Sequence, residues 1–203
     1  KRFWLRLRKA KKKKPVDLDV TIGVINQESE DPKEHFAKFL SSKEIAIYSG
    51  HARYGTGPDF DPEKSVKENF VIGVNSALHK TGRLTKGYDP EVNKALLGRA
   101  NELEAISKAG RFNPRLYQIW FLNACKTIHY LDEIRGGLVK GKSKTNLRVV
   151  GTTRDIYGDA IPFIDGILKQ KSMRWILGWL NRAERAERRS RGEKVRRSYY
   201  FSV

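Results

Sequence analysis

The sequence predicts an α/β fold, a doubly wound and mostly parallel sheet with helices on both faces. Short segments rich in Val, Ile and aromatic residues alternate with longer segments whose apolar residues recur at helical spacing. Such alternation is typical of parallel strands joined by right-handed crossover helices. In open sheets of this class the functional side chains gather at the carboxyl ends of the strands, so we expect the chemistry of this chain there.

Four segments are predicted as strands because each is short, apolar and followed by a polar or glycine-containing cluster. They are residues 16–26, 44–48, 115–122 and 147–150. Residues 70–79 are ambiguous between strand and loop. Three of the four strands run directly into clusters of residues that are common in active sites.

Four further segments are predicted as helices. One begins at Asp31-Pro32, residues typical of a helix start, and continues to about residue 40. A second spans residues 90–110, and a third follows Cys125 to about residue 135. The fourth is a long helix that follows Pro162 and reaches about residue 187, with apolar positions at helical spacing and a basic opposite side.

The formal net charge is +18, from 41 Lys and Arg against 23 Asp and Glu. Most of the excess lies at the two ends, which divides the chain into a basic segment 1–15, a domain 16–182 and a basic segment 183–203. We expect both ends to be solvated tails, because blocks of like charge repel and stay in water. They also favour an anionic partner, either nucleic acid or an anionic membrane surface.

The cysteine count limits the possible sites. Cys125 is the only cysteine, so no intramolecular disulfide holds the fold, and scattered histidines do not provide zinc-ligand spacing beside it. No segment approaches a run of about 18 apolar residues, so a membrane-spanning helix is not expected. The chain begins with Lys1, which leaves open both a cytoplasmic location and export after removal of a signal peptide.

Three strand ends carry residues that are common in active sites. The strand 44–48 leads into Ser-Gly-His51, the strand 115–122 leads into Asn-Ala-Cys125, and the strand 147–150 leads into Gly-Thr-Thr at 151–153. If these strands are parallel neighbours, all three ends lie at one edge of the sheet. His51 and Cys125 would then lie close together despite their separation in the sequence.

A thiol beside an imidazole suits nucleophilic catalysis. A free thiol is mostly protonated at neutral pH, and a neighbouring imidazole can accept its proton. A helix start after Cys125, with Lys126 beside it, is expected to favour the thiolate. Backbone N–H groups at Gly50, Ala52 and Cys125 are candidates for stabilising the oxyanion of a tetrahedral intermediate.

The segments IAIYSGH and IWFLNACKT resemble the histidine and cysteine motifs of the caspase-like cysteine peptidases, nearest to the bacterial CHAT, gingipain and clostripain types. The family has a doubly wound sheet, with the histidine after one strand and the cysteine after the next. The resemblance extends over about residues 16–182 and implies catalysis by His51 and Cys125. One departure is Ala52, where the family often has glycine directly after the histidine.

The segment VVGTTRDIYGDAIPFIDGIL is similar to the family region that helps line the pocket for the side chain before the scissile bond, which implies substrate contacts from Thr152 and Thr153. Asp59 and Asp155 are candidates for recognising a basic side chain through paired hydrogen bonds, with Asp159 a rival for the same role. Arg53 or Arg154 would instead suit an acidic side chain. We favour the basic preference, because several acidic residues lie in these loops.

The first hypothesis is therefore a cysteine endopeptidase that acts on a protein or peptide substrate and requires no cofactor. Some members of the family are activated by calcium or by self-cleavage, and the basic loop 136–146 lies where such processing takes place in the family. The alternative is a non-catalytic basic domain on the same fold that binds nucleic acid or an anionic membrane. A pseudo-peptidase joins the two hypotheses, and Ala52 is the feature that favours it.

Overall fold

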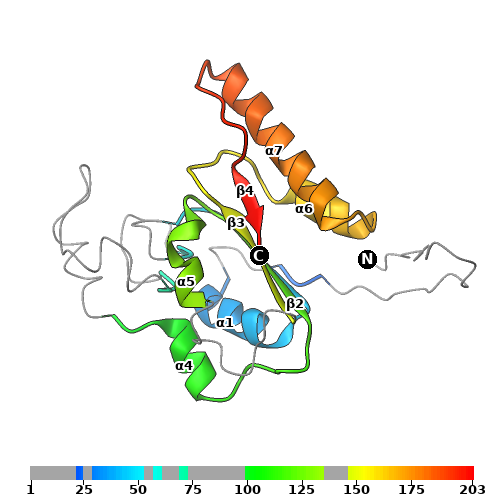
Figure 1. Cartoon of the computed structure of the whole chain (residues 1–203). Coiled ribbons are helices and arrows are strands. Elements are labelled where there is room, and N and C mark those ends of the chain that lie inside the picture. The colour runs from blue at the N-terminus through cyan, green and yellow to red at the C-terminus, as the bar shows by residue number, and fades with distance from the viewer. Residues whose placement is uncertain (1–21, 25–28, 53–56, 61–68, 73–98, 135–145) are drawn as a thin grey trace, which may run out of the picture.

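The structure is a computed structural model of the whole chain (Figure 1). It describes residues 22–24, 29–52, 57–60, 69–72, 99–134 and 146–203. The basic segment 1–15, most of the expected strand 16–26 and residues 90–98 of the expected helix 90–110 lie outside these ranges. In the described part of that expected helix, Glu102–Lys108 is helical. Residues 22–24, at the end of that expected strand, are described without regular structure.

The sheet has four strands in the order β1-β2-β3-β4. These are β1 Ile45–Ser49, β2 Gln118–Asn123, β3 Leu147–Thr152 and β4 Tyr200–Ser202. The first three pair in parallel, and β4 pairs antiparallel with β3. The predicted mostly parallel α/β fold is confirmed, and three of the predicted strands appear within three residues of their expected bounds.

Helices cover both faces of the sheet (Figure 1). One face carries α1 Pro32–Ser42, α4 Glu102–Lys108 and the short α5 Leu131–Glu133. The other face carries α6 Ile161–Leu168 and α7 Met173–Ser190. The central strand β2 is buried on both sides, as expected for a strand between two helical layers.

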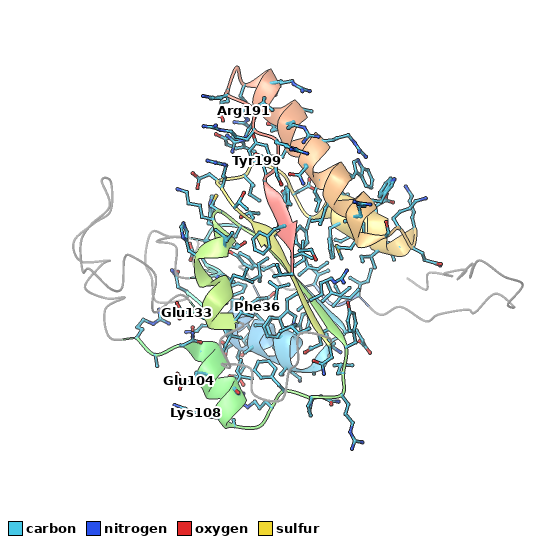
Figure 2. The ribbon with its side chains drawn as sticks, in the orientation of Figure 1. Phe36, Glu104, Lys108, Glu133, Arg191 and Tyr199 are labelled. Carbon is cyan, nitrogen blue, oxygen red and sulfur yellow. The ribbon has the colours of Figure 1, made fainter. Side chains whose placement is uncertain are left out.

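Two apolar cores lie on the two sides of the sheet. Trp120 and Leu122 of β2 point into the first core, which α1 enters through Phe36, labelled in Figure 2. Phe121 points into the second core, where its ring stacks on Phe163 of α6 with a centroid distance of 4.2 Å. Alternate residues of one strand therefore serve opposite layers, which fixes the register of β2.

The long helix expected from Pro162 to about residue 187 is wrong, because two helices occupy this stretch. The α6 helix ends at Leu168, and Gln170 takes a left-handed backbone with φ of 54°. Ser172 then caps α7, and its side chain accepts a hydrogen bond of 3.3 Å from the Trp175 N–H. A serine cap competes with continued helix because its hydroxyl satisfies the N–H groups of a new first turn.

The segment 183–203 is not a solvated tail, so the domain boundary expected at residue 182 is wrong. The α7 helix crosses that boundary and ends at Ser190, and β4 completes the sheet. Tyr199 and Tyr200 are buried at 1% and 3% exposure in the second core. The consecutive aromatic residues Tyr199, Tyr200 and Phe201 supply enough apolar surface to add an edge strand despite the basic residues before them.

The remaining expectations have mixed outcomes. The helix expected at 31–40 is confirmed by α1, which Asp31 caps through a hydrogen bond from the Glu34 N–H. The helix expected directly after Cys125 begins instead as a 3₁₀ turn, Thr127–Tyr130. Within the described ranges, no helix is long and apolar enough to cross a membrane.

Candidate functional site

The carboxyl ends of β1 and β2 meet at one edge of the sheet. Ser49 and Asn123 are register partners at the ends of these two parallel strands. His51 and Cys125 each follow two residues later, at equivalent places beyond the last pair. His51 is exposed and Cys125 is half-buried. The predicted adjacency of the two strand ends is therefore confirmed.

The Tyr48 side chain fixes the backbone around His51 by hydrogen bonding. The His51 carbonyl accepts hydrogen bonds from the Tyr48 hydroxyl at 2.6 Å and from the Asp59 N–H at 3.1 Å. The Tyr48 ring is buried at 6% exposure against Phe36 and Phe60. A buried phenol that holds a loop carbonyl defines where the histidine leaves the strand.

The turn that carries Cys125 is held by β3. Lys126 has a left-handed backbone with φ of 52°, and its N–H donates to the Arg154 carbonyl at 3.0 Å. The Thr152 hydroxyl donates to the Ala124 carbonyl, and the Thr152 N–H donates to the Thr127 hydroxyl at 2.6 Å. These buried contacts fix both sides of the cysteine.

The thiol of Cys125 lies against the loop that follows β3. Burial raises the pKa of the Cys125 thiol above its ordinary value, and the Ile156 N–H that donates to the sulfur opposes this rise. The Asp155 carboxylate raises the pKa further, through its charge and by accepting a hydrogen bond from the thiol, and Lys126 lowers it. The expected bias toward the thiolate is therefore wrong, because burial outweighs the nearby lysine and no α-helix begins at the cysteine.

The three expected oxyanion donors differ in availability. The Gly50 N–H donates to the Asn123 carbonyl at 3.1 Å, so that donor is already used. Within the described residues, no acceptor contacts the N–H groups of Ala52 or Cys125. Ala52 packs its methyl group against the first core, and its φ is not in the left-handed region, so an alanine fits here without strain.

The four expected substrate-contact residues differ in their exposure to solvent. Thr152 is fully buried at 0% exposure, and Asp59 is buried at 5%. Thr153 is half-buried, and its hydroxyl donates to the Tyr199 carbonyl at 3.2 Å. Asp155 is exposed, and it forms an ion pair of 3.1 Å with Lys126. Asp155 is thus the accessible carboxylate beside the thiol, whereas Thr152 and Asp59 hold the backbone in place.

Two buried polar residues near this edge had no expected role. Asn123 is 2% exposed, and its side chain contacts β1, β4 and the loop after β3. Glu184 is 0% exposed on α7, where it ion-pairs with Arg188 at 2.9 Å. A sequence signal for Glu184 exists, because it continues the buried helical stripe of Ile176 and Leu180 at four-residue spacing.

Comparison with known proteins finds no relative. No family model, no curated protein and no solved structure matches this chain. In the part of the chain that the structure describes, no three His, Cys, Asp or Glu side chains gather into a metal-binding group.

Proposed function

We propose that the chain is a caspase-like cysteine endopeptidase with Cys125 as nucleophile and His51 as general base and acid. The observation that carries the proposal is the register of β1 and β2, in which Ser49 pairs with Asn123. Each strand then delivers one member of the pair two residues later at the same edge. An imidazole and a thiol at one edge of a sheet are the minimum set for acyl transfer.

The proposed reaction begins with a protonated thiol, in agreement with the raised pKa of Cys125. As Sγ attacks the peptide carbonyl carbon, the thiol proton passes to the His51 imidazole. Amides of Ala52 and Cys125 stabilise the oxyanion. The C–N bond then breaks, and His51 gives the proton to the leaving amine. Water hydrolyses the thioester, returning the proton to sulfur and releasing the acid.

The proposal includes a basic side chain before the scissile bond. Asp155 supports it, because this exposed carboxylate lies beside the thiol and already pairs with a cation, the Lys126 ammonium, at 3.1 Å. A substrate guanidinium or ammonium would replace Lys126 as the partner of this carboxylate. Activation by calcium or by cleavage in the loop 136–146 remains part of the proposal, and residues 135–145 lie outside the described residues.

The test is covalent labelling by acyloxymethyl ketones that carry Arg, Lys, Asp or Asn, read by intact mass with and without calcium. We expect labelling by the Arg and Lys probes that disappears in Cys125→Ala and falls strongly in His51→Ala. His129→Ala and His35→Ala are the matched controls and keep wild-type labelling. No labelling of the wild-type chain by any probe would overturn the peptidase proposal and favour the pseudo-peptidase.

A second candidate function is docking on an anionic membrane. The observation that favours it is a group of Trp and Lys side chains at and just before the start of α7. Trp175 is 38% exposed and meets Trp179 edge to face at 5.0 Å. The Lys171 and Lys169 ammonium groups lie 5.5 and 5.9 Å from these two rings. Exposed Trp beside Lys is typical of a membrane interface, where the ring enters the headgroup region and the cation meets lipid phosphate.

This second candidate is tested by sedimentation with phosphatidylserine vesicles and with phosphatidylcholine vesicles. We expect salt-sensitive binding to the anionic vesicles alone, and a severalfold loss in Trp175→Ala and Lys171→Glu. Tyr117→Ala is the control, because Tyr117 is also exposed, at 47%, but lies in the segment before β2 and not on α7. Binding of an RNA oligomer without vesicle binding would replace the membrane with nucleic acid.

A further inference from the structure

Asn123 joins three elements at the edge of the sheet that carries Cys125. Its Nδ2 donates to Ser49 Oγ and to the Gly158 carbonyl, both at 2.9 Å, and its Oδ1 accepts from the Tyr200 hydroxyl at 3.0 Å. The Gly158 carbonyl accepts only, which fixes the orientation of the amide. Burial raises the pKa of Tyr200, so its hydroxyl stays protonated and donates.

Glu184 holds the same loop from the opposite side. Its Oε2 accepts from the N–H groups of Tyr157 and Gly158, each at 3.0 Å. Its Oε1 accepts from Arg188 Nε at 2.9 Å, and Arg188 in turn donates to the Asp155 carbonyl. A fully buried carboxylate with two backbone donors and one guanidinium is well satisfied, so this contact is a rigid support for the loop.

Arg188 is itself held in place by aromatic rings. Its guanidinium lies 4.9 Å from the ring centroids of both Tyr157 and Tyr199, and it pairs with Glu193 at 2.6 Å. Figure 2 shows Tyr199 beside the end of α7. Cation–π contacts on both rings restrict the guanidinium to one position. The support for the loop thus extends through α7 to the strand that completes the sheet.

The loop 155–158 is the wall against which the thiol lies. Lys126, directly after the cysteine, donates its N–H to the Arg154 carbonyl at 3.0 Å and pairs with the Asp155 carboxylate at 3.1 Å. The Ile156 N–H lowers the pKa of the thiol, and the Asp155 carboxylate raises it. Asn123 and Glu184 bind the same residue, Gly158, through its carbonyl and its N–H respectively. A shift of this loop would therefore change the surroundings of the sulfur directly.

We infer that Asn123 and Glu184 are positioning residues that clamp the loop 155–158 against Cys125, with Asn123 also holding the end of β1 that leads to His51. This inference rests on the proposed function. Neither residue touches the sulfur in the contacts described, so each acts through the loop or through the strand end. The clamp keeps the thiol covered and protonated until a substrate arrives. It also fixes the direction from which the sulfur attacks the substrate carbonyl.

The first variant is Asn123→Asp, which preserves size and removes the amide donors. A carboxylate facing the Gly158 carbonyl repels it, so the loop moves away. The matched control is Gln118→Glu at the opposite end of β2. The Gln118 amide is 0% exposed and also donates to two carbonyls, of Leu40 at 2.9 Å and Lys43 at 2.7 Å. The control therefore disturbs the same strand equally without contacting the loop.

The second variant is Glu184→Gln, which removes the negative charge between Arg188 and the loop. Its matched control is Glu187→Gln on the same helix. Glu187 pairs with Arg191 at 2.8 Å with the same four-residue spacing, but it makes no contact with the loop 155–158 among the described interactions. Ser49→Ala is a third, milder variant at an exposed position, and it removes one hydrogen bond of Asn123.

The experiment measures the alkylation of Cys125 by iodoacetamide as a function of pH, together with labelling by the Arg ketone probe. Because Cys125 is the only cysteine, intact mass reports that residue alone. In Asn123→Asp and Glu184→Gln we expect alkylation at neutral pH to rise by about tenfold, equivalent to a one-unit fall in the thiol pKa. Labelling by the ketone probe falls, because an exposed thiol is no longer aligned. Ser49→Ala shows the same pattern with a rise of about threefold.

Wild-type alkylation rates in folded Glu184→Gln and Ser49→Ala would overturn the inference, as would an equal rise in Gln118→Glu or Glu187→Gln. If Asn123→Asp does not fold, Glu184→Gln and Ser49→Ala decide the question. Alkylation needs no substrate, so the clamp is tested even if the wild-type chain reacts with no ketone probe. That last result would overturn the peptidase proposal alone.

Discussion

The Asn123 amide donates a hydrogen bond of 2.9 Å to Ser49 Oγ, across the same strand pair in which these two residues are register partners. A side-chain contact therefore reinforces a backbone ladder at the point where both strands end. This double connection fixes how far β1 and β2 extend before the chain turns to His51 and to Cys125. The edge of the sheet is consequently a rigid base for both residues.

Asp155→Asn tests the surroundings of the thiol. Burial remains in this variant, but the variant lacks the carboxylate charge that raises the pKa of Cys125, and it frees Lys126 to favour the thiolate. The pKa falls, so alkylation at neutral pH accelerates severalfold, a limited effect because Asp155 is exposed and screened. Asp159→Asn, in the same loop, is the control. An unchanged or slower rate in Asp155→Asn would contradict the assigned cause.

The pH profile of the wild-type thiol follows from the same shift. A pKa above the ordinary value of about 8.5 means that the thiolate fraction is small at neutral pH. We expect the alkylation rate to keep increasing with pH beyond the point where a free cysteine peptide levels off. Stopped-flow or mass-spectrometric rates measured from about pH 6 to about pH 10, two units on either side of about pH 8, test this. A profile that levels off earlier than the peptide would show a lowered pKa.

Phe163→Ala tests the second core. Phe163 is 0% exposed and stacks on Phe121, so its loss leaves a cavity between α6 and the sheet. We expect the free energy of unfolding to fall by about 3–5 kcal/mol. The control is Ile161→Ala on the same helix, where a side chain that is 67% exposed should change it by less than about 0.5 kcal/mol. Urea unfolding followed by circular dichroism measures both variants. Equal losses of stability would contradict the burial of Phe163 between α6 and the sheet.

A chain that ends at Arg197 tests whether the C-terminal segment belongs to the domain. It lacks β4 and the buried rings of Tyr199 and Tyr200, each of which contributes about 1.5–3 kcal/mol by burial. We expect strong destabilisation and increased aggregation through the uncovered edge of β3. Val203→Ala is the control, because it retains the backbone pairing with Val149. Unchanged thermal unfolding of the shortened chain would restore the interpretation of this segment as a tail.

Ser172→Ala tests the break between α6 and α7. Loss of the cap to the Trp175 N–H should reduce stability by about 1 kcal/mol, and Ser172→Asp should retain it. A continuous helix would give the opposite sign, because alanine is the better interior residue. Ser190→Ala, at the other end of α7, is the control. Thermal unfolding of the variants distinguishes the two interpretations.

The sequence by itself predicted the α/β class, three strands of the sheet and the two strand ends that carry His51 and Cys125. These features are local, because periodicity and turn residues are properties of neighbouring positions. The start of α1 at Asp31 was predicted for the same reason. The family resemblance, the peptidase activity and the basic preference stay predictions.

Only the tertiary structure decided the rest. The aromatic run Tyr199–Phe201 does not by itself predict a strand until β3 provides an edge to pair with. The thiol pKa depends on a loop that begins 30 residues after Cys125 in the sequence, and Lys126 next to it proved the weaker influence. Asn123 and Glu184 meet at Gly158 because the sheet and α7 bring distant polar groups into one water-poor space. Burial of this kind depends on the packing of the whole chain, which local spacing does not encode.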